Sequence, residues 1–441
     1  MPSASYHFPK NFLWGTATSS HQVEGGNNNN NWSRWEEQGH TPHKSGLACD
    51  WWGEQWREDF DRAAKSGQNA IRLSLEWSRI QPSPYTWDQA SLDRYRGMLQ
   101  GAAARGLTPM VTLHHFTDPL WVTDQGAWEN EATVSLFAAY VRRVVEVLKE
   151  QCSLWCTINE PNVYAIEGYL RCSYPPGTYS LKNFLLVQAN LLRAHAAAYR
   201  IIHELQPNAQ VGYALHFRPQ RPAHPRFPPD AWMSKLKFSA INMAFPSAIS
   251  TGIMRSPVGK VPIPEAVGTQ DYLGLNYYNP DTVAFDLRMP KELFSRSFFP
   301  KGSDVSEAGT NANIPSGFFP SLKWIHKTYP NLPVYVTENG IEDASDHIRP
   351  RYLAEHVHAM WRAVNFTWPV RGYFHWTLVD NFEWERGWNQ RFGLWELDVE
   401  TQERHKRPSA DLYEAICREN GLTSTMVEQY CPEAFGRLFP G

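Results

Sequence analysis

Several features that would direct a chain to a membrane or to nucleic acid are missing from this sequence. It has no run of about 18 apolar residues, the length that a membrane-spanning helix requires. Its 42 Lys and Arg residues are balanced by 45 Asp and Glu residues, so the formal net charge is only -3. A nucleic-acid-binding protein would show a basic surface. We therefore expect neither a membrane nor a nucleic-acid partner.

A secretory signal and a disulfide framework are also missing. Residues 1–10 lack the charged segment and the apolar stretch that a secretory signal combines. Six cysteines in 441 residues are too sparse for a disulfide scaffold. Cys152 and Cys156 lie close together, but no further Cys or His follows at the spacing of a zinc finger. These absences predict a cytoplasmic protein with mostly reduced thiols.

The motifs of several common enzyme classes do not occur. No G-x-G-x-x-G follows the first strand-like segment, and no Walker-type phosphate loop is present, which argues against a nucleotide cofactor. H-E-x-x-H and G-x-S-x-G are absent as well, so a zincin or an α/β-hydrolase is not indicated. The absence of these motifs therefore gives no sign of a dinucleotide or phosphate-loop site.

Aromatic residues, by contrast, are abundant, with 19 Trp, 19 Tyr and 22 Phe. Many of these rings must fill the core, because they are large hydrophobic bodies. Tryptophan beside acidic and amide residues is also what a sugar pocket needs. The C–H face of a pyranose packs on an indole, while its hydroxyls require polar partners. Several segments of this chain mix the two residue types.

The chain shows no Gly/Ser-rich linker, short repeat or charge block, so residues 1–441 are predicted to form a single domain. Its one low-complexity tract, Asn27 to Asn31, is interpreted as a surface loop because Asn favours turns. Eight apolar runs are typical of buried strands. They are Phe12 to Ala17, Ala70 to Leu75, Pro109 to Leu113, Leu154 to Ile158, Gln210 to Leu215, Tyr272 to Asn276, Leu332 to Val336 and Gly372 to Trp376.

Amphipathic stretches typical of helices separate most of these runs. They are Trp52 to Lys65, Ser91 to Arg105, Glu131 to Glu150, Asn183 to Leu205, Phe318 to Thr328 and Arg351 to Val364. Strands that alternate with helices indicate an α/β protein, and eight of them favour closure into a (β/α)8 TIM barrel. An open, doubly wound sheet is the alternative.

Polar residues follow each predicted strand. They are Gln22; Glu76 and Trp77; His114 and His115; Asn159 and Glu160; His216; Tyr277 and Tyr278; Glu338 and Asn339; Asp380 and Glu383. In a barrel the C-terminal ends of the strands surround one pocket, where active sites lie. An open sheet would spread the same residues along a line.

Two of these residues, Glu160 and Glu338, directly follow buried-looking strands, where a charge is costly unless it is paired or functional. Cleavage of a glycosidic bond with retention uses such a pair: one carboxylic acid protonates the leaving oxygen and one carboxylate attacks the anomeric carbon. The alternative is that both are rim residues in salt bridges. The polar residues at the other strand ends favour the catalytic pair.

Five segments resemble the motifs of glycoside hydrolase family 1. In chain order they are Phe-Leu-Trp-Gly-Thr-Ala-Thr-Ser-Ser-His-Gln-Val-Glu-Gly, Thr-Ile-Asn-Glu-Pro, Leu-Gly-Leu-Asn-Tyr-Tyr, Val-Thr-Glu-Asn-Gly and Trp-Thr-Leu-Val-Asp-Asn-Phe-Glu-Trp. The resemblance extends from residue 11 to about residue 408. It implies a retaining β-glycosidase on a (β/α)8 barrel, with the active site at the C-terminal ends of the strands, and an activity that needs no cofactor and no metal. The implied substrates are terminal β-D-glucosides, β-D-fucosides and β-D-galactosides, including short oligosaccharides.

The resemblance also implies roles for individual residues. Glu160 matches the family acid/base and Glu338 the nucleophile, with Arg72 and Tyr278 beside the nucleophile. We expect Arg72 to hold the pKa of Glu338 low, because a nearby cation favours the ionised carboxyl. Asn276 would support the pair.

The sugar-binding residues implied in the same way are Gln22, His115, Asn159, Tyr278, Trp376, Glu383 and Trp384. Taken alone, each has a structural alternative. Trp376 and Trp384 could be core aromatics, Gln22 could cap a loop, and Arg72 could pair with Glu76.

Some segments depart from the family pattern. Asp118 stands where an apolar residue is more usual, Phe116 where many relatives have Trp, and Glu385-Arg386-Gly387-Trp388 follows Phe-Glu-Trp. We expect these positions to lie in loops or on the leaving-group side.

Two other functions remain open. One is a sugar-binding protein on an inactive barrel. The other is a metal-dependent hydrolase that uses His114, His115, His216 and Asp118.

Overall fold

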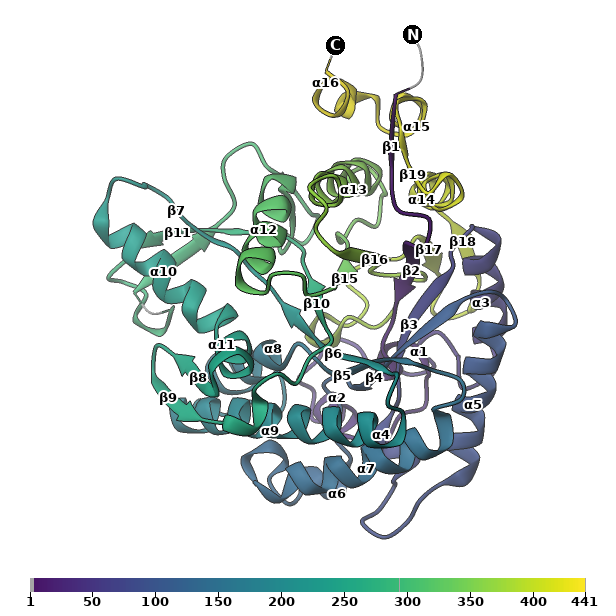
Figure 1. Cartoon of the computed structure of the whole chain (residues 1–441), viewed down its shortest axis with the longest axis vertical. Helices are drawn as coiled ribbons and strands as arrows, with labels where there is room; N and C mark the ends of the chain where they lie inside the picture. Colours follow the sequence, from purple (N-terminus) through teal and green to yellow (C-terminus); the bar gives the residue numbers. More distant parts are fainter. Residues whose placement is uncertain (1–3, 293, 441) are drawn as a thin grey trace.

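The computed structural model describes residues 4–292 and 294–440, and its centre is a closed barrel of eight parallel strands (Figure 1). In chain order the strands are β2 (Leu13–Ala17), β3 (Ala70–Ser74), β4 (Thr108–His114), β5 (Leu154–Asn159), β6 (Gln210–His216), β10 (Tyr272–Asn276), β15 (Val334–Asn339) and β16 (Val370–His375). Each pairs in parallel with its neighbours, and β16 closes the barrel on β2. The barrel prediction is confirmed, and the open-sheet alternative is wrong.

Helices surround the barrel and cover the outer face of its strands (Figure 1). The longer ones are α3 (Trp56–Lys65), α5 (Gln89–Ala103), α7 (Ala132–Leu148), α9 (Leu181–Leu205), α12 (Phe318–Thr328), α13 (Arg349–Asn365) and α14 (Pro408–Glu419). Local capping fixes several of their starts. Asp88 accepts a hydrogen bond from the Ser91 N–H at 3.1 Å to cap α5, and Ser180 accepts one from the Asn183 N–H at 3.1 Å to cap α9. All six predicted helices are present, with small shifts at their ends.

Some barrel strands continue beyond the apolar runs that predicted them. The seventh was predicted as Leu332 to Val336 but spans Val334–Asn339, so Glu338 lies within the strand and not after it. The fourth, β5, was predicted as Leu154 to Ile158 and likewise includes Asn159. Backbone pairing continues through these polar positions, since Asn276 stands opposite Glu338 in the ladder. The last residues of these strands are polar because their side chains belong to the pocket. A search for apolar runs therefore ends the predicted strand too early.

The asparagine tract is not a surface loop throughout. Asn30 caps the short helix α2 (Asn31–Glu37): its side chain accepts a hydrogen bond from the Ser33 N–H at 2.8 Å, and the Ser33 hydroxyl lies 3.2 Å from the Asn30 N–H. Asn27, Asn30 and Asn31 are buried, and Asn28 is exposed. These residues are chemically identical, so tertiary packing alone decides which of them is buried and which is exposed.

Several smaller elements complete the fold. Between β6 and β10 the chain forms α10 (Pro228–Asn242), α11 (Ala244–Thr251) and the hairpin of β8 (Ile253–Ser256) and β9 (Gly259–Pro262). A three-stranded sheet joins β7 (Gln220–Pro222), β11 (Asp281–Phe285) and β12 (Ser295–Phe298). At the top of Figure 1, β1 (Ser5–His7) pairs with β19 (Gly421–Thr423), so the two ends of the chain lie side by side. None of the described helices is long and apolar enough to cross a membrane.

The remaining helices and strands are short. The helices are α1 (Ser20–Val23), α4 (Trp77–Ile80), α6 (Leu120–Thr123), α8 (Pro161–Ile166), α15 (Ser424–Tyr430) and α16 (Phe435–Leu438); the strands are β13 (Asp304–Val305), β14 (Ala312–Asn313), β17 (Trp395–Leu397) and β18 (Arg404–Lys406). Many of these elements belong to the loops that follow barrel strands.

A buried ion pair anchors the loop that follows β16. Asp380 is fully buried and receives two hydrogen bonds from the Arg407 guanidinium, each 2.9 Å long. The Gly393 N–H also donates to it at 2.8 Å. Because this loop carries residues 383 and 384, the pair ties the barrel rim to the segment before α14.

Replacing Asp380 by Asn should destabilise the protein by about 3–5 kcal/mol, because Arg407 would keep a buried charge without a counter-ion. Urea denaturation followed by far-ultraviolet circular dichroism measures the change in midpoint. Asp124→Asn is the matched control, since Asp124 pairs with Arg34 at the surface, where its side chain is 58% exposed. Equal midpoints for the two variants would show that the Asp380 pair is not an anchor.

Candidate active site

A cavity of about 210 Å³ opens at the C-terminal ends of the barrel strands. Seven of the predicted site residues line it: His115, Glu160, Tyr278, Glu338, Trp376, Glu383 and Trp384. The other four, Gln22, Arg72, Asn159 and Asn276, are buried and are not among the lining residues. The barrel therefore brings residues that lie in or after seven of its eight strands, between Gln22 and Trp384 in the chain, to one pocket and its supporting layer.

Glu338 is held by a cation on one side and a phenol on the other. The Arg72 guanidinium donates to its Oε1 at 2.6 Å, and the Tyr278 hydroxyl donates to its Oε2 at 2.8 Å. Arg72 has no exposed surface. The alternative pairing of Arg72 with Glu76 is wrong, because hydroxyl groups of Ser20, Ser78 and Thr117 donate to Glu76 instead.

Glu160 lies at the junction of β5 and α8, in an environment without a direct contact to arginine. Its Oε1 accepts from the Asn276 amide at 2.9 Å and lies 3.0 Å from His216 Nδ1. Its backbone is left-handed, with φ 43° and ψ 55°, and Pro161 then starts the helix. A non-glycine residue in this region costs about 1–3 kcal/mol, which such sites tolerate when the surroundings fix the geometry.

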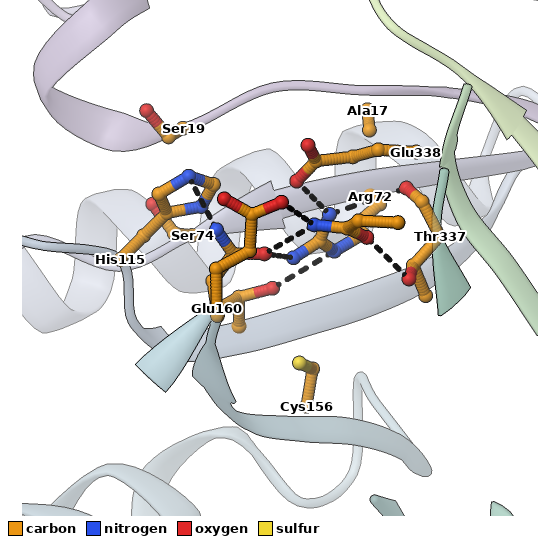
Figure 2. Close-up of polar contacts among 12 residues, drawn as sticks. Ala17, Ser19, Arg72, Ser74, His115, Cys156, Glu160, Thr337 and Glu338 are labelled. Atoms are coloured by element: carbon orange, nitrogen blue, oxygen red, sulfur yellow. Dashed lines mark hydrogen bonds and ion pairs between the residues drawn. The ribbon is translucent and has the colours of Figure 1, made fainter. Parts of the chain in front are cut away.

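One continuous set of hydrogen bonds links the two carboxyl groups. Asn159 Oδ1 accepts from Arg72 at 2.6 Å and from the Asn276 amide at 3.0 Å, and Asn276 also donates to Glu160. Figure 2 shows Glu160 and Glu338 reaching toward the same region, with the Arg72 guanidinium close to both. A displacement of any one member would disturb both carboxyl groups.

The expectation that Arg72 would make the pKa of Glu338 low is wrong. Burial raises the pKa of Glu338 above its ordinary value, and nearby Glu160 raises it further. Arg72 and Tyr278 act in the predicted direction but only partly offset the loss of water. Two carboxyl groups that share one buried pocket retain a proton more readily than either would in solution.

Glu383 contributes a third carboxyl group. Its Oε2 accepts from the Gln22 amide at 3.2 Å, while the same amide donates to the Phe382 carbonyl at 2.7 Å. Burial, together with nearby Glu385, raises the pKa of Glu383 to about 8. Burial also raises the pKa of Glu385 to about 6. At neutral pH Glu383 therefore retains its proton.

Aromatic rings and a neutral imidazole form another wall. His115 stacks near Trp376 and Trp384, with centroid distances of 6.2 and 5.9 Å. Burial and the Arg72 cation hold the pKa of His115 well below its ordinary value, so its Nε2 can accept the 3.0 Å hydrogen bond from Asn159. Phe116, a departure from the family pattern, lines the pocket and packs edge-on against Trp384 at 5.1 Å.

The histidines near the pocket do not converge. His114 Nε2 lies 3.0 Å from Asp118, whereas His115 contacts Asn159 and His216 contacts Glu160. Within residues 4–292 and 294–440, no three His, Cys, Asp or Glu side chains group as metal ligands would. The proposed His and Asp cluster of a metal-dependent hydrolase is therefore not assembled.

Asp118 lies in the loop after β4, as expected. It is fully buried and accepts hydrogen bonds from Trp128 at 3.0 Å and Tyr164 at 2.8 Å, so it supports this loop and is not among the residues that line the pocket.

The sequence did not reveal a further group of lining residues. These are Val163, Glu167, Arg171, Tyr174, Arg218, Thr310, Asn311, Gln390 and Phe392. Most of them lie in loops or short helices well beyond a strand end, where no periodic pattern distinguishes pocket residues from surface residues. The role of His216 as a partner of Glu160 was also missed, although its place after a predicted strand was a usable signal.

A parallel eight-stranded barrel with carboxyl groups gathered at its C-terminal mouth is typical of glycoside-cleaving enzymes. The sequence profile of Glycosyl hydrolase family 1 matches residues 4–422. The chain belongs to this family, which consists of retaining glycosidases.

Relatives of similar length support the assignment. Beta-glucosidase A of Thermotoga maritima is 31% identical over 453 aligned positions, covering 94% of this chain and 98% of the relative. A beta-glucosidase of Agrobacterium is 30% identical, covering 93% and 95%.

Solved structures agree with the fold. A beta-glycosidase from Pyrococcus horikoshii superimposes with a TM-score of 0.90 at 35% identity, covering 97% of this chain and 98% of the other. The Thermotoga maritima beta-glucosidase in complex with glucoimidazole gives a TM-score of 0.89 at 29% identity, covering 95% and 100%.

The raised pKa of Glu383 has a consequence for stability. A carboxyl group that binds its proton more tightly when folded favours the folded state at low pH, and this contribution falls as pH rises from about 4.5 to about 8. Glu383→Gln should therefore gain stability relative to the wild type across this interval. Thermal unfolding at half-unit pH steps measures the difference, with the non-titrating neighbour variant Gln22→Asn as control. A Glu383→Gln difference that stays constant with pH would contradict the expected titration.

Proposed function

We propose that the protein hydrolyses terminal, non-reducing β-D-glycosyl residues by double displacement, with Glu338 as nucleophile and Glu160 as acid/base. The observation that carries the proposal is the different support of the two carboxyl groups in one pocket. Glu338 contacts a fully buried cation at 2.6 Å, whereas Glu160 contacts an amide and an imidazole. An arginine partner stabilises the charged form of a carboxyl group, as the attacking nucleophile requires, and Glu160 has no such partner.

In the first step Glu338 attacks the anomeric carbon while Glu160 gives its proton to the departing oxygen. The bond from the sugar to the leaving group breaks, and an ester bond to Glu338 forms. In the second step the deprotonated Glu160 takes a proton from water, whose oxygen attacks the same carbon and releases Glu338. Two inversions leave the configuration of the sugar unchanged.

The glycone side of the pocket is suited to an uncharged sugar. Glu383 and Gln22 would bind ring hydroxyls, His115 and Asn159 would bind others, and Trp376 would contact the C–H face. Relatives named beta-glucosidase and beta-galactosidase indicate that β-D-glucosides and β-D-galactosides both fit such a pocket. We include β-D-fucosides, which differ from β-D-galactosides only by the loss of one hydroxyl group.

The wider physiological setting belongs to the same proposal. We treat residues 1–441 as one glycosidase domain acting in the cytoplasm, with a role in degrading cellulose fragments. The pairing of β1 with β19 and the contacts of α13 with α14 join the ends of the described chain to the barrel.

Azide rescue should separate the two carboxyl roles. Glu338→Gly should lose hydrolysis of 4-nitrophenyl β-glucoside, and azide should then yield the α-glycosyl azide from an activated substrate, because azide occupies the space of the nucleophile. Glu160→Ala should still form the glycosyl-enzyme with good leaving groups, and azide should yield the β-azide. Product configuration is read by proton NMR. The opposite configurations would reverse the assignment, and full activity of both variants would exclude these two carboxyl groups as the catalytic pair. A wild type without activity would leave only sugar binding; exposed Glu204→Ala is the control.

The acidic limb of the pH profile should depend on Tyr278. Its hydroxyl donates to Glu338 and lowers the pKa of that carboxyl, so Tyr278→Phe should raise it. Since Glu338 has to be ionised to attack, the acidic limb of kcat/KM should move to higher pH in the variant. The measurement uses 4-nitrophenyl β-glucoside between pH 4 and 9, roughly the range over which carboxyl groups in such sites titrate. Tyr335→Phe, a tyrosine outside the pocket, should leave the limb in place, and a limb shifted to lower pH would refute the role of Tyr278.

A further inference from the structure

One histidine at the mouth of the barrel contacts the proposed acid/base directly. His216, the last residue of β6, places its Nδ1 3.0 Å from Glu160 Oε1. Its ring lies nearly parallel to that of Tyr278, with the centroids 6.0 Å apart and the planes at 26°. The Asn162 amide donates to the backbone carbonyl of His216 at 2.8 Å. Contacts other than the one to Glu160 therefore hold both the backbone and the ring of this histidine in place.

The hydrogen bonds that reach the Glu160 side chain converge on one of its two oxygens. The Asn276 amide donates to Oε1 at 2.9 Å, and this amide is oriented because the Thr337 hydroxyl donates to Asn276 Oδ1 at 2.6 Å. His216 Nδ1 is the second partner of Oε1. In the described part of the chain no hydrogen bond reaches Oε2, and Glu160 lines the active-site cavity. Oε2 is therefore the oxygen that remains for a substrate.

This convergence decides which oxygen of Glu160 carries the proton in the acid form. Two donors already engage the lone pairs of Oε1, so a proton there would face other hydrogens, and it belongs on Oε2. Oε1 can then only accept, and His216 has to donate to it from Nδ1. The ring hydrogen is thus assigned to Nδ1 from the chemistry of its partner.

Charged groups on the neighbouring elements surround the pair of His216 and Glu160. On the pocket side they are Glu338 with its partner Arg72, and Glu383. On the outer side His216 also lines a side cavity of about 50 Å³, whose charged residues form the ion pairs Glu167 with Arg171 and Asp281 with Arg218, each at 2.8 Å. Lys237 of α10 lies 3.8 Å from Glu292. Because these outer charges cancel in pairs, the direct hydrogen bond from His216 is the main influence on Glu160 from that side.

We propose that His216 positions the acid/base: its Nδ1–H and the Asn276 amide together occupy Oε1 and keep the transferable proton of Glu160 on Oε2. In the first step the O–H bond at Oε2 breaks as the proton passes to the leaving oxygen. In the second step Oε2 takes the proton of the attacking water. Oε1 stays hydrogen-bonded in both steps, so the carboxyl group keeps one orientation. This inference rests on the proposed glycosidase function and adds a positioning residue to it.

Three substitutions test whether the position of the donor matters. His216→Phe keeps a ring against Tyr278 but removes the donor. His216→Asn places an amide near the position of Nδ1, whereas His216→Gln extends its amide toward the position of Nε2. The measurement is kcat/KM for phenyl β-glucoside, whose leaving group needs a proton from Glu160, and for 2,4-dinitrophenyl β-glucoside, whose leaving group does not.

His216→Phe and His216→Gln should lower the ratio of kcat/KM for the phenyl substrate to that for the dinitrophenyl substrate about fivefold to tenfold, the factor expected for the loss of one hydrogen bond to a carboxyl group. His216→Asn should restore most of the ratio, because it returns a donor to Oε1. A side chain that only filled space would affect both substrates alike.

The basic limb of kcat/KM for phenyl β-glucoside is a second readout. A donor favours the ionised form of a carboxyl group, so its removal delays the loss of the acid form as pH rises. His216→Phe should therefore move this limb to higher pH by about 0.5–1 unit, and His216→Asn should leave it near the wild-type position.

His405→Phe is the control, because the side chain of His405 is 60% exposed. A ratio and a basic limb that are the same in His216→Phe and His405→Phe would overturn the inference, and so would equal restoration by His216→Asn and His216→Gln. If circular dichroism shows that His216→Phe does not fold, the comparison of the other two variants decides. A wild type that cleaves neither substrate contradicts the proposed function itself, whereas cleavage of both with an unchanged ratio contradicts only the role of His216.

Discussion

The buried contact between Arg72 and Glu338 is the constraint on which the rest of the active site depends. A guanidinium with no exposed surface has to find an acceptor for its donors, and here they reach the side chains of Thr112, Asn159 and Glu338 and the Thr337 carbonyl. These acceptors belong to three other strands, so the requirement of one cation fixes the relative positions of β3, β4, β5 and β15. Removal of either charge would leave the other buried and unpaired.

The pocket gathers more acid than the cation can compensate. Glu160, Glu338 and Glu383 all line it, and of these three carboxyl groups only Glu338 contacts the buried Arg72. Burial consequently raises the pKa of Glu338, Glu383 and Glu385, and protons remain in the site at neutral pH. This arrangement suits glycoside cleavage, because the reaction begins with one protonated and one ionised carboxyl group. The barrel tolerates the cost because Asp380, Arg407 and the aromatic wall hold the surrounding loops in place.

The two sides of the pocket differ in how they are built. The inner side chains are tied to one another, as Gln22 is to Glu383 and His115 to Asn159. At the rim, Arg171 and Arg386 pair with Glu167 and Glu385, and both arginines are about half exposed. The pocket therefore has a tightly connected inner end and a polar, partly exposed rim.

The sequence alone determined the number of barrel strands, the approximate positions of six helices, the location of Glu160 and Glu338 at strand ends and the family, because apolar runs and short motifs are local properties. It could not determine where β15 ends, that Asn30 caps a helix or that Asp118 is buried, since each depends on neighbours distant in the chain. Only the tertiary structure decided the pKa of Glu338, where desolvation outweighs the adjacent arginine. The three arginines at the rim of the cavity could not be predicted either, because Arg171, Arg218 and Arg386 come to line one cavity only when the barrel closes.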